Sequence, residues 1–332
     1  MKNIVGIDIG GTKCAVSLGK IDNNGKIEVT DKLVYPTRDY ADPYKMLDQL
    51  QEGALQLFSK YGLTIDKIES IGISCGGPLD SVRGLILSPP NLPGWDNIPA
   101  VELFQQKLEI PMAIQNDANA CALAEWKFGT GKGLQNVIFL TFGTGMGAGL
   151  ILNGKLYAGT NDMAGEVGHI RLENMGPVGY GKAGSFEGFC SGGGIAQLAQ
   201  IKIREKLQMG ESVSFCSSLQ QLDSVTAQTV AEAAIKGDPL AAGIYETCGT
   251  YMGRALSVLI DILNPEMIIL GSIFVRSGDL LISAINRQIE AEALPHSSRV
   301  CQIAPAKLGE SIGDYAALSV AAYHLENIKQ KA

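Results

Sequence analysis

Near the N-terminus the sequence reads IVGIDI at residues 4–9, GGTK at residues 10–13 and CAVSLG at residues 14–19. β-Branched residues on both sides of a glycine-rich turn predict two short strands joined as a hairpin. Glycines leave the backbone N–H groups of such a turn bare, because no Cβ blocks the approach of a ligand. The stretch therefore predicts the first unit of the fold and also a candidate ligand loop.

A related pattern recurs in the second half, with VIFLTF at residues 137–142, GTG at 143–145 and GLIL at 149–152. Aligning IDIGGTKCAV with LTFGTGMGAG places Gly10 opposite Gly143 and Gly11 opposite Thr144. A weak internal repeat of this kind indicates two related lobes.

The rest of the chain alternates strand-like and helix-like segments, which predicts an α/β fold. We expect helices at residues 43–61, 118–128, 240–263, 280–294 and 311–327, and strands at 68–74, 109–115 and 267–270. The predicted boundary follows Asp117. The small lobe would cover residues 1–117, with the C-terminal helix at about 312–332 packing back on it, and the large lobe would cover residues 118–311.

The composition is that of an ordinary globular protein. The chain has 332 residues, of which 46% are hydrophobic and 18% are charged, and this is enough for two lobes with separate cores. The formal net charge is −7, and no basic cluster lies along any predicted face. Nucleic-acid binding needs positive charge to neutralise phosphates, so we expect no nucleic-acid partner.

Cysteine usage and the N-terminus predict a cytoplasmic protein. Seven cysteines, an odd number with no Cys-x-x-Cys spacing, favour reduced thiols over disulfides or metal ligands. The residues MKNIVGID contain no apolar segment typical of a secretory signal. The uncharged stretch from residue 133 to residue 154 is long enough for a membrane span, but its glycines favour two strands around a turn.

The two glycine-rich turns are candidate phosphate loops, since bare N–H groups and threonine hydroxyls can cradle phosphate oxygens. Either turn alone could be an ordinary hairpin turn. Gly143, Gly145 and Ala148 also fit a loose dinucleotide pattern, but that pattern needs a following helix, and a strand follows here. The Walker pattern is absent as well. The residues expected to contact the nucleotide are Gly10, Gly11, Thr12, Lys13, Gly143, Thr144 and Gly145.

Asp8 lies in the first strand and faces the first turn, so it is the natural partner for the Mg²⁺ that accompanies ATP. The alternative is a structural carboxylate that accepts hydrogen bonds from the amides of Gly11 or Thr12.

The motif Asn116-Asp117-Ala-Asn119 ends a predicted strand and opens a predicted helix. Asn and Asp are preferred helix N-caps, which could explain one of these residues but not three polar residues in four. An aspartate at this place could accept a hydroxyl proton during phosphoryl transfer.

Glu166, His169 and Glu187 lie in a glycine-rich segment that is rich in hydrogen-bond acceptors. Glu-x-x-His is also a di-metal motif, but that motif needs paired helices, and Gly165 and Gly168 argue against a helix. Carboxylates and imidazole bind vicinal hydroxyls well, so a sugar site is more natural. The histidine could still be a structural residue.

These motifs together resemble the ROK family of sugar kinases and repressors, from about residue 4 to residue 325. The matching stretches are GIDIGGTK, PPNLPGW, QNDANACALAE, TFGTGMGAGLILNGKLYAGTNDMAGEVGH and NPEMIILGS. The resemblance implies the two-lobed actin-like ATPase fold, related to ribonuclease H, with an internally duplicated core. It also implies transfer of the γ-phosphate of ATP·Mg²⁺ to a small sugar by a cytoplasmic homodimer. Repressor members carry an N-terminal helix-turn-helix, which we do not expect here because the first predicted strand starts at once.

The same resemblance assigns roles to individual residues. It implies that Asp117 is the general base, that Asn116, Glu166, His169 and Glu187 bind the sugar, and that loops containing Gly77 and Asn91 approach it. Thr12 and Thr144 match residues near the ATP phosphates. Gly271 matches the adenosine-side turn, although Ser272 stands where a second glycine is common.

The expected reaction is the phosphorylation of a hexose, glucose-like and at O6, with ATP and Mg²⁺ as cofactors. The alternatives are another sugar, such as fructose, allose, N-acetylmannosamine or N-acetylglucosamine, and a sugar sensor that binds without turnover.

One departure from the family pattern concerns a metal. Many members carry C-x-C-G-x-x-G-C-x-E, whose cysteines join the histidine on a structural zinc. Here Val178, Tyr180 and Ser185 replace all three cysteines, while Glu187 remains. His169 alone cannot hold a tetrahedral zinc. We expect no structural zinc site, with Val178 and Tyr180 packing where the metal would sit.

This expectation has a direct test in elemental analysis of protein purified without added metal. The predicted zinc content is far below one atom per chain. Stoichiometric zinc that survives gel filtration would contradict it.

Overall fold

The computed structural model describes residues 1–22, 24–40 and 42–331, so the final residue of the predicted C-terminal helix lies outside the described residues. The chain forms two compact units. The first contains residues 1–135, 149–164 and 307–332, and the second contains residues 136–148 and 165–306. Helix α3 (Asp117–Phe128) belongs to the first unit, which therefore continues past the boundary that the sequence places after Asp117.

The first unit is built on a five-stranded sheet of order β3-β2-β1-β4-β7. Its strands are β1 (Lys2–Ile9), β2 (Lys13–Ile21), β3 (Ile27–Pro36), β4 (Ile68–Cys75) and β7 (Met112–Asn116). The predicted N-terminal hairpin is confirmed, because β1 and β2 pair antiparallel around a three-residue turn at residues 10–12. β3 adds a third antiparallel strand, whereas β1, β4 and β7 are mutually parallel.

The register of the three parallel strands decides where their ends lie. Ile9 of β1 pairs with Cys75 of β4, and Cys75 pairs in turn with Asn116 of β7. The carboxyl ends of the three strands are therefore level, and the residues that follow them emerge at one edge of the sheet. Ligand sites of parallel sheets characteristically lie at this edge.

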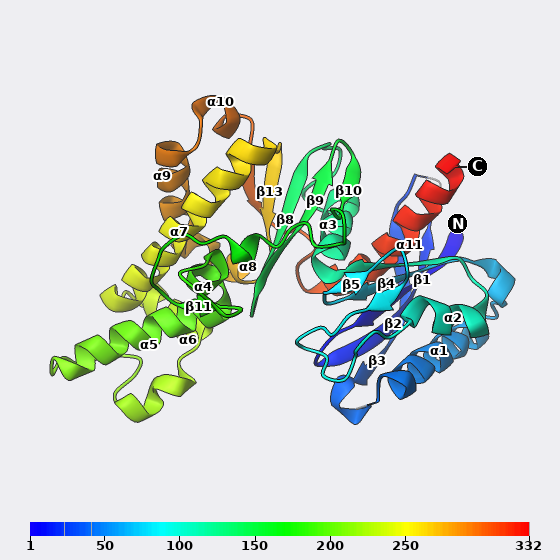
Figure 1. The fold of residues 1–332 in the computed structure, drawn as a ribbon, viewed down its shortest axis with the longest axis horizontal. Helices are drawn as coiled ribbons and strands as arrows, with labels where there is room; N and C mark the ends of the chain where they lie inside the picture. The colour runs from blue at the N-terminus through cyan, green and yellow to red at the C-terminus, as the bar shows by residue number, and fades with distance from the viewer. Residues whose placement is uncertain (23, 41, 332) are drawn as a thin grey trace. The chain divides into compact units, whose positions relative to one another are not determined.

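Helices cover both faces of this sheet (Figure 1). Helix α1 (Pro43–Lys60) and α2 (Ala100–Leu108) lie on one face, and α3 and α11 (Ile312–Lys331) lie on the other. Helix α1 begins where the sequence predicts, since the Asp42 side chain caps the Tyr44 N–H and Pro43 occupies the first turn. Its apolar stripe, with Met46 and Leu50, is fully buried in the core of the unit.

Glycine allows α11 to pack directly on β4. A Cβ at Gly72 would lie 2.2 Å from the carbonyl oxygen of Ala317 and 2.3 Å from the backbone nitrogen of Ala321. Gly6 of β1 meets the same helix, since its Cβ would lie 2.8 Å from the Leu318 nitrogen. The C-terminal helix is thereby fixed against the strands that carry the carboxyl-end edge.

A second sheet has the order β10-β9-β8-β13-β14. Its strands are β8 (Val137–Phe142), β9 (Met146–Leu152), β10 (Lys155–Tyr157), β13 (Met267–Leu270) and β14 (Gln302–Pro305). The repeat inferred from the sequence is visible here, because β8 and β9 flank a three-residue turn at residues 143–145, as β1 and β2 do at residues 10–12. The uncharged stretch thus forms strands, and none of the helices in the described ranges has the length and apolar character that crossing a bilayer requires.

Of the second sheet, β8, β13, β14 and the start of β9 belong to the second unit, and the rest of that unit is mostly helical. Helix α7 (Pro239–Leu263) packs closely on α9 (Ile282–Glu292), because a Cβ at Gly253 would lie 2.7 Å from the Ile285 carbonyl. The remaining helices are α4 (Phe186–Cys190), α5 (Gly192–Gln208), α6 (Ala227–Ile235), α8 (Ile273–Ser277) and α10 (Pro295–Ser298). This unit also contains the short strands β11 (Val178–Gly179) and β12 (Lys182–Ala183) and the 3₁₀ turns η3 (Val167–His169), η4 (Leu219–Ser224) and η5 (Gly278–Leu280).

The first unit contains the short strands β5 (Leu79–Asp80) and β6 (Leu85–Ile86) and the 3₁₀ turns η1 (Thr37–Asp39), η2 (Ile65–Lys67) and η6 (Gly309–Ser311).

The contact between α11 and β4 generates a stability prediction. Gly72→Ala places a methyl group against helix backbone that cannot rotate away, and we expect it to lower the free energy of unfolding by about 3 kcal/mol. The matched control is Gly243→Ala on α7, where a Cβ meets nothing within 4 Å. That change should stabilise by about 0.5–1 kcal/mol, because alanine is the better helix former.

Urea unfolding of both variants measures these effects. A Gly72→Ala protein as stable as the wild type would contradict the proposed packing of α11.

Candidate active site

In the first unit, the predicted site residues gather at the carboxyl-end edge of the parallel strands. A Cβ on Gly11 would lie 2.5 Å from the carbonyl oxygen of Asn91, and one on Gly76 would lie 3.1 Å from the side chain of Asn91. A Cβ on Gly77 would lie 2.7 Å from the amide nitrogen of Asn116. The turn after β1, the loop after β4 and the end of β7 thus meet at one place, and glycine permits each approach.

Asn116 and Asp117 lie where β7 passes into α3. Asn116 is the N-cap, and its Oδ1 accepts a hydrogen bond of 2.8 Å from the Ala118 N–H. Asp117 Oδ1 accepts from the same N–H at 2.9 Å, and the residue is exposed. Asn119 is buried, and its Nδ2 donates to Gln115 Oε1 at 3.2 Å. Both Asn116 and Asp117 therefore accept from the N–H at the start of α3, and Asp117 is the most exposed of the three polar residues of this motif.

Asp8 is a largely buried carboxylate close to this edge. Burial, followed by the negative charge of Asp117, raises the pKa of Asp8 from its ordinary 3.8 to about 6. The charge of Lys32 lowers the pKa, that of Asp314 raises it, and that of Lys13 lowers it. The carboxylate is therefore ionised at neutral pH but held at a cost. Such an oxygen donor suits Mg²⁺, which is bound through one or two carboxylates together with substrate phosphates and water.

The turn at residues 10–12 is held in place by hydrogen bonds from Thr37. Thr37 Oγ1 donates a hydrogen bond of 2.6 Å to the carbonyl oxygen of Gly10, and the Thr37 N–H donates to the carbonyl oxygen of Thr12 at 3.0 Å. Gly11, Thr12 and Lys13 are exposed. This arrangement occupies two carbonyls of the turn and presents its other side to solvent, as an anion-binding loop requires.

In the second unit, the turn at residues 143–145 is joined to α4 and α5. The Met146 N–H donates a hydrogen bond of 2.9 Å to Glu187 Oε2, and a Cβ on Gly145 would lie 3.0 Å from the same oxygen. The Gly192 N–H at the start of α5 donates to the Gly143 carbonyl at 2.7 Å. Glu187 therefore anchors this turn in addition to the sugar contact that the sequence analysis expects of it.

Gly271 directly follows β13, and its neighbour Ser272 lies beside the same turn, since a Cβ on Gly143 would lie 3.9 Å from Ser272 Oγ. The Gly271 N–H donates to the Leu140 carbonyl at 3.0 Å, and a Cβ on Gly271 would lie 3.1 Å from the ring of Phe139. Ser272 has φ +42°, a backbone region that favours glycine. This explains why a second glycine would suit the position, which this chain fills with serine.

Glu166, His169 and Glu187 also belong to this second group. Glu166 is exposed and precedes η3, and its carbonyl accepts from the His169 N–H at 3.2 Å. A Cβ on Gly168 would lie 3.3 Å from the Glu187 Cβ. The ring of Tyr180 lies 5.1 Å from the ring of His169, centroid to centroid, at an interplanar angle of 78°.

The structure therefore gathers the predicted residues into two groups, one in each unit. The first group contains Asp8, Gly10, Gly11, Thr12, Lys13, Gly77, Asn91, Asn116 and Asp117. The second contains Gly143, Thr144, Gly145, Glu166, His169, Glu187 and Gly271.

Two features near these groups escape the sequence analysis. One is the start of α5, where Ser191 caps Gly194 and Gly192 contacts the second turn. The sequence feature that could have indicated this helix start is the run SGGG at residues 191–194, because serine is a preferred N-cap. The other is the hairpin of β11 and β12. Its Val178 and Tyr180, expected to pack at the zinc position, are 46% and 64% exposed, because the two-residue turn lifts Tyr180 to the tip.

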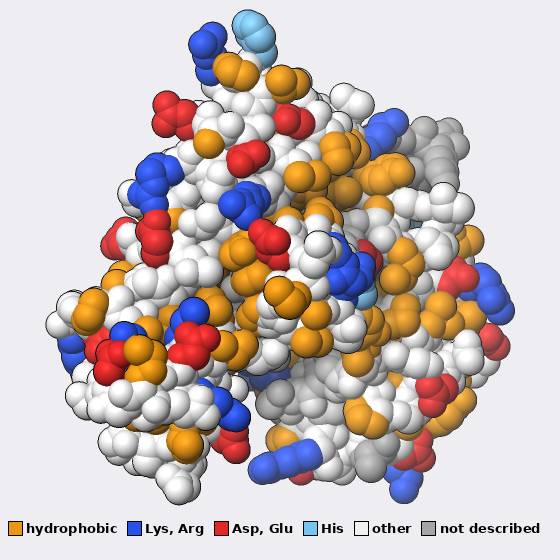
Figure 2. Space-filling model, turned by 60° about the vertical axis from the view of Figure 1, so that its left-hand side comes forward, with side chains coloured by type: hydrophobic (Ala, Val, Ile, Leu, Met, Phe, Trp, Pro, Cys, Tyr) orange, Lys and Arg blue, Asp and Glu red, His pale blue; other side chains and the backbone are white. Residues whose placement is uncertain are grey.

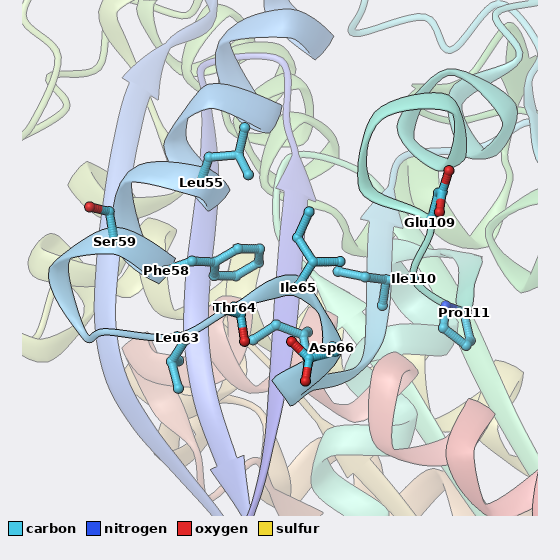
Figure 3. Close-up of a pocket in the computed structure, with 11 residues that line it drawn as sticks. Leu55, Phe58, Ser59, Leu63, Thr64, Ile65, Asp66, Glu109, Ile110 and Pro111 are labelled. Atoms are coloured by element: carbon cyan, nitrogen blue, oxygen red, sulfur yellow. The ribbon is translucent and has the colours of Figure 1, made fainter.

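A cavity of about 850 Å³ in the first unit lies away from this site (Figure 3). It is lined by Leu55, Phe58, Ser59, Leu63, Thr64, Ile65, Asp66, Ile68, Glu109, Ile110 and Pro111. Ile68 is the first residue of β4, whereas Gly76 follows its last. Eight strand residues span roughly 25 Å at about 3.3 Å each, so the cavity opens at the opposite edge of the sheet.

The surface and the acidic side chains give two further observations. On the face shown in Figure 2, basic side chains are interspersed with acidic ones and do not gather into one area. Within residues 1–22, 24–40 and 42–331, no three His, Cys, Asp or Glu side chains are grouped so that they could hold a metal ion by themselves.

Two mixed sheets, each with a glycine-rich turn between two antiparallel strands, define the class of protein. This is the actin-like ATPase fold, which the solved structures of ROK sugar kinases share. The chain belongs to the ROK family, whose family model matches residues 4–323. It is 30% identical over 311 residues to a glucokinase of Halalkalibacterium halodurans, covering 93% of this chain and 92% of that protein.

A solved structure and a repressor show the range of the family. The structure of a ROK family glucokinase from Streptomyces griseus in complex with glucose and AMPPNP matches with a TM-score of 0.70 and 28% identity, over 96% of this chain and 99% of that one. The DNA-binding transcriptional repressor Mlc of Escherichia coli is 29% identical over 260 residues, covering 78% of this chain and 62% of the repressor.

The raised pKa of Asp8 predicts a pH-dependent stability. The folded state binds more protons than the unfolded state between pH 4 and pH 6, so ionisation of Asp8 lowers the free energy of unfolding as the pH rises. Two pKa units correspond to about 3 kcal/mol. We expect Asp8→Asn to raise the free energy of unfolding by about 1–3 kcal/mol at pH 7.5, and by much less at pH 4.

Urea unfolding at both pH values, without nucleotide or Mg²⁺, measures this difference. Glu290→Gln on the exposed face of α9 is the control for loss of one negative charge. An equal change in the free energy of unfolding at both pH values would show that ionisation of Asp8 does not destabilise the folded state.

Proposed function

We propose that this protein is an ATP-dependent sugar kinase that transfers the γ-phosphoryl group of ATP to a hexose hydroxyl, with glucose at O6 as the first candidate. The observation that carries the proposal is the exposed Asp117 carboxylate at the carboxyl-end edge of three parallel strands, beside Asn116 and Gly77. The glucose and AMPPNP bound by the related Streptomyces griseus enzyme support it.

In this proposal Asp117 is the general base that takes the proton of the attacking hydroxyl. The proposed sugar-binding residues of the first unit are Asn116 and the loops containing Gly77 and Asn91. Those of the second unit are Glu166, His169 and Glu187, whose acceptor-rich character suits vicinal hydroxyls.

The nucleotide would be bound by the two glycine-rich turns, with Gly271 on the adenosine side. Backbone amides at residues 10–13 and 144–145 would offer donors to phosphate oxygens, whereas the Gly143 N–H donates to the Gly145 carbonyl within its own turn. Bound with ATP, Mg²⁺ would neutralise part of the charge on the transferring phosphoryl group. Asp8 is the residue that would hold the ion, directly or through water, because it is a partly buried carboxylate just before the first turn.

The competing function is a sugar sensor without turnover, and the relationship to the Mlc repressor is the observation in its favour. The retention of Asp8, Asp117 and both turns favours the kinase. A sensor would bind sugar and produce no ADP, so the two functions differ in one assay.

The test is ADP production from ATP·Mg²⁺ with glucose, fructose, mannose, allose, N-acetylglucosamine and N-acetylmannosamine. We expect one sugar to stand out, and Asp117→Asn to lower kcat with that sugar by about 10²–10⁴-fold, the contribution of a general base. The KM for ATP should change little, because Asp117 does not belong to either glycine-rich turn.

Near-normal turnover in Asp117→Asn would remove this residue as the base. No ADP with any sugar, while binding of a sugar is seen by calorimetry, would favour the sensor instead.

A further inference from the structure

The hairpin at residues 178–183 lies against the sugar-binding candidates of the second unit. β11 and β12 pair antiparallel, with Val178 opposite Ala183, and are joined by a two-residue turn. Tyr180 and Gly181 have φ values of +42° and +74°. Both central residues of a type I′ turn require positive φ, which asparagine and glycine adopt readily and tyrosine does not. The backbone therefore disfavours tyrosine at this position.

Burial does not explain the tyrosine either, since its side chain is 64% exposed. Its ring instead meets the imidazole of His169, with centroids 5.1 Å apart and planes at 78°. This is an edge-to-face contact within the favourable range for aromatic pairs. Tyr180 therefore has an unfavourable backbone conformation, and its side chain makes a contact with His169.

The other residues of the hairpin contact the same region. Lys182 Nζ donates a hydrogen bond of 2.7 Å to the carbonyl oxygen of His169, which fixes the backbone of that residue. On the opposite strand, a Cβ on Gly179 would lie 2.8 Å from Cβ and Cγ of Glu187, so the hairpin also packs directly on Glu187. One small hairpin therefore supports both the imidazole and a carboxylate proposed to bind sugar.

The hairpin is itself held from two sides. Gln197 of α5 donates from Nε2 to the Val178 carbonyl at 2.8 Å, and its Oε1 accepts from the Val178 N–H at 3.0 Å. Arg171 Nη1 donates to the Ala183 carbonyl at 2.8 Å. Both strands of the hairpin are therefore anchored, which holds the backbone from which Tyr180 projects.

We propose that Tyr180 and Lys182 are positioning residues, which hold the His169 imidazole in the orientation that binds a sugar hydroxyl. Tyr180 restricts rotation of the ring, and Lys182 fixes the backbone from which the ring projects. The inference rests on the proposed function, since it presumes that His169 binds sugar. It assigns to side chains of this chain the task of orienting that histidine.

Two substitutions of Tyr180 separate positioning from stability. Tyr180→Gly removes the ring and also relieves the positive-φ backbone, so its melting temperature should be unchanged or higher. Its affinity for the preferred sugar, measured by calorimetry without ATP, should fall at least tenfold. Its KM for ATP should stay within twofold of the wild type. Tyr180→Phe keeps the ring and should bind sugar as the wild type does.

Tyr44→Ala, which removes an exposed tyrosine from α1, is the matched control and should leave sugar affinity unchanged. Tyr180→Gly protein that binds sugar as tightly as the wild type would overturn the inference. Wild-type protein that neither binds nor phosphorylates any sugar would overturn the proposed function itself, which is a different result.

A second measurement reads the contact without any ligand. The chain has three histidines, so the Hε1 resonance of His169 can be assigned in a proton NMR spectrum with a His169→Gln protein. Tyr180→Gly should shift this resonance by removing the ring current, and Tyr180→Phe should not. An unchanged His169 resonance in Tyr180→Gly would overturn the inference whatever the affinity for sugar.

Discussion

The parallel register of β1, β4 and β7 is the constraint on which the first half of the site depends. Because Ile9, Cys75 and Asn116 are level across the sheet, the turn after β1, the loop after β4 and the start of α3 open at one edge. A slip of one residue in any strand would turn its side chains to the opposite face. Helix α11 packs directly on β4, the middle of these three parallel strands, at Gly72.

The second group of site residues also includes a glycine-rich turn between two strands, here in the second sheet. A three-residue turn between β8 and β9 presents glycine amides, and Glu187 and the first turn of α5 fix it by hydrogen bonds to Met146 and Gly143. In the first turn, Thr37 has the corresponding task. Both turns are thus held by hydrogen bonds to neighbouring residues, and Gly11, Thr12, Thr144 and Gly145 are exposed. If these turns bind phosphate as proposed, their donors are positioned in advance, which lowers the cost of reorganisation.

Local pattern predicted much of this fold. β8 and β13 begin and end at the predicted residues, and α1 begins at Pro43 as predicted. Helix α7 begins at Pro239, one residue before the predicted start at residue 240. The failures have physical causes. Glu109, expected in a strand, is instead the left-handed C-cap of α2. Helix α5, with 17 residues, was not predicted, because it begins with three glycines and glycine is a poor helix former. The sequence feature that indicates its start is Ser191, the N-cap.

The candidate site residues could be named from motifs, but their environment could not. Nothing in the sequence around Asp8 indicates that burial and Asp117 raise its pKa, because Asp117 is brought near only by strand pairing. The anchoring of Met146 by Glu187 and the contact of Tyr180 with His169 likewise join residues through tertiary structure alone.

The most direct test of the central claim is ³¹P NMR of the wild-type protein with ATP, Mg²⁺ and glucose, because it identifies the phosphoryl acceptor. The account predicts that the γ-phosphorus signal of ATP is replaced by that of a glucose phosphate ester, in equal amount to the ADP formed. Release of inorganic phosphate alone, or an unchanged spectrum while glucose is bound, would contradict transfer to a sugar hydroxyl.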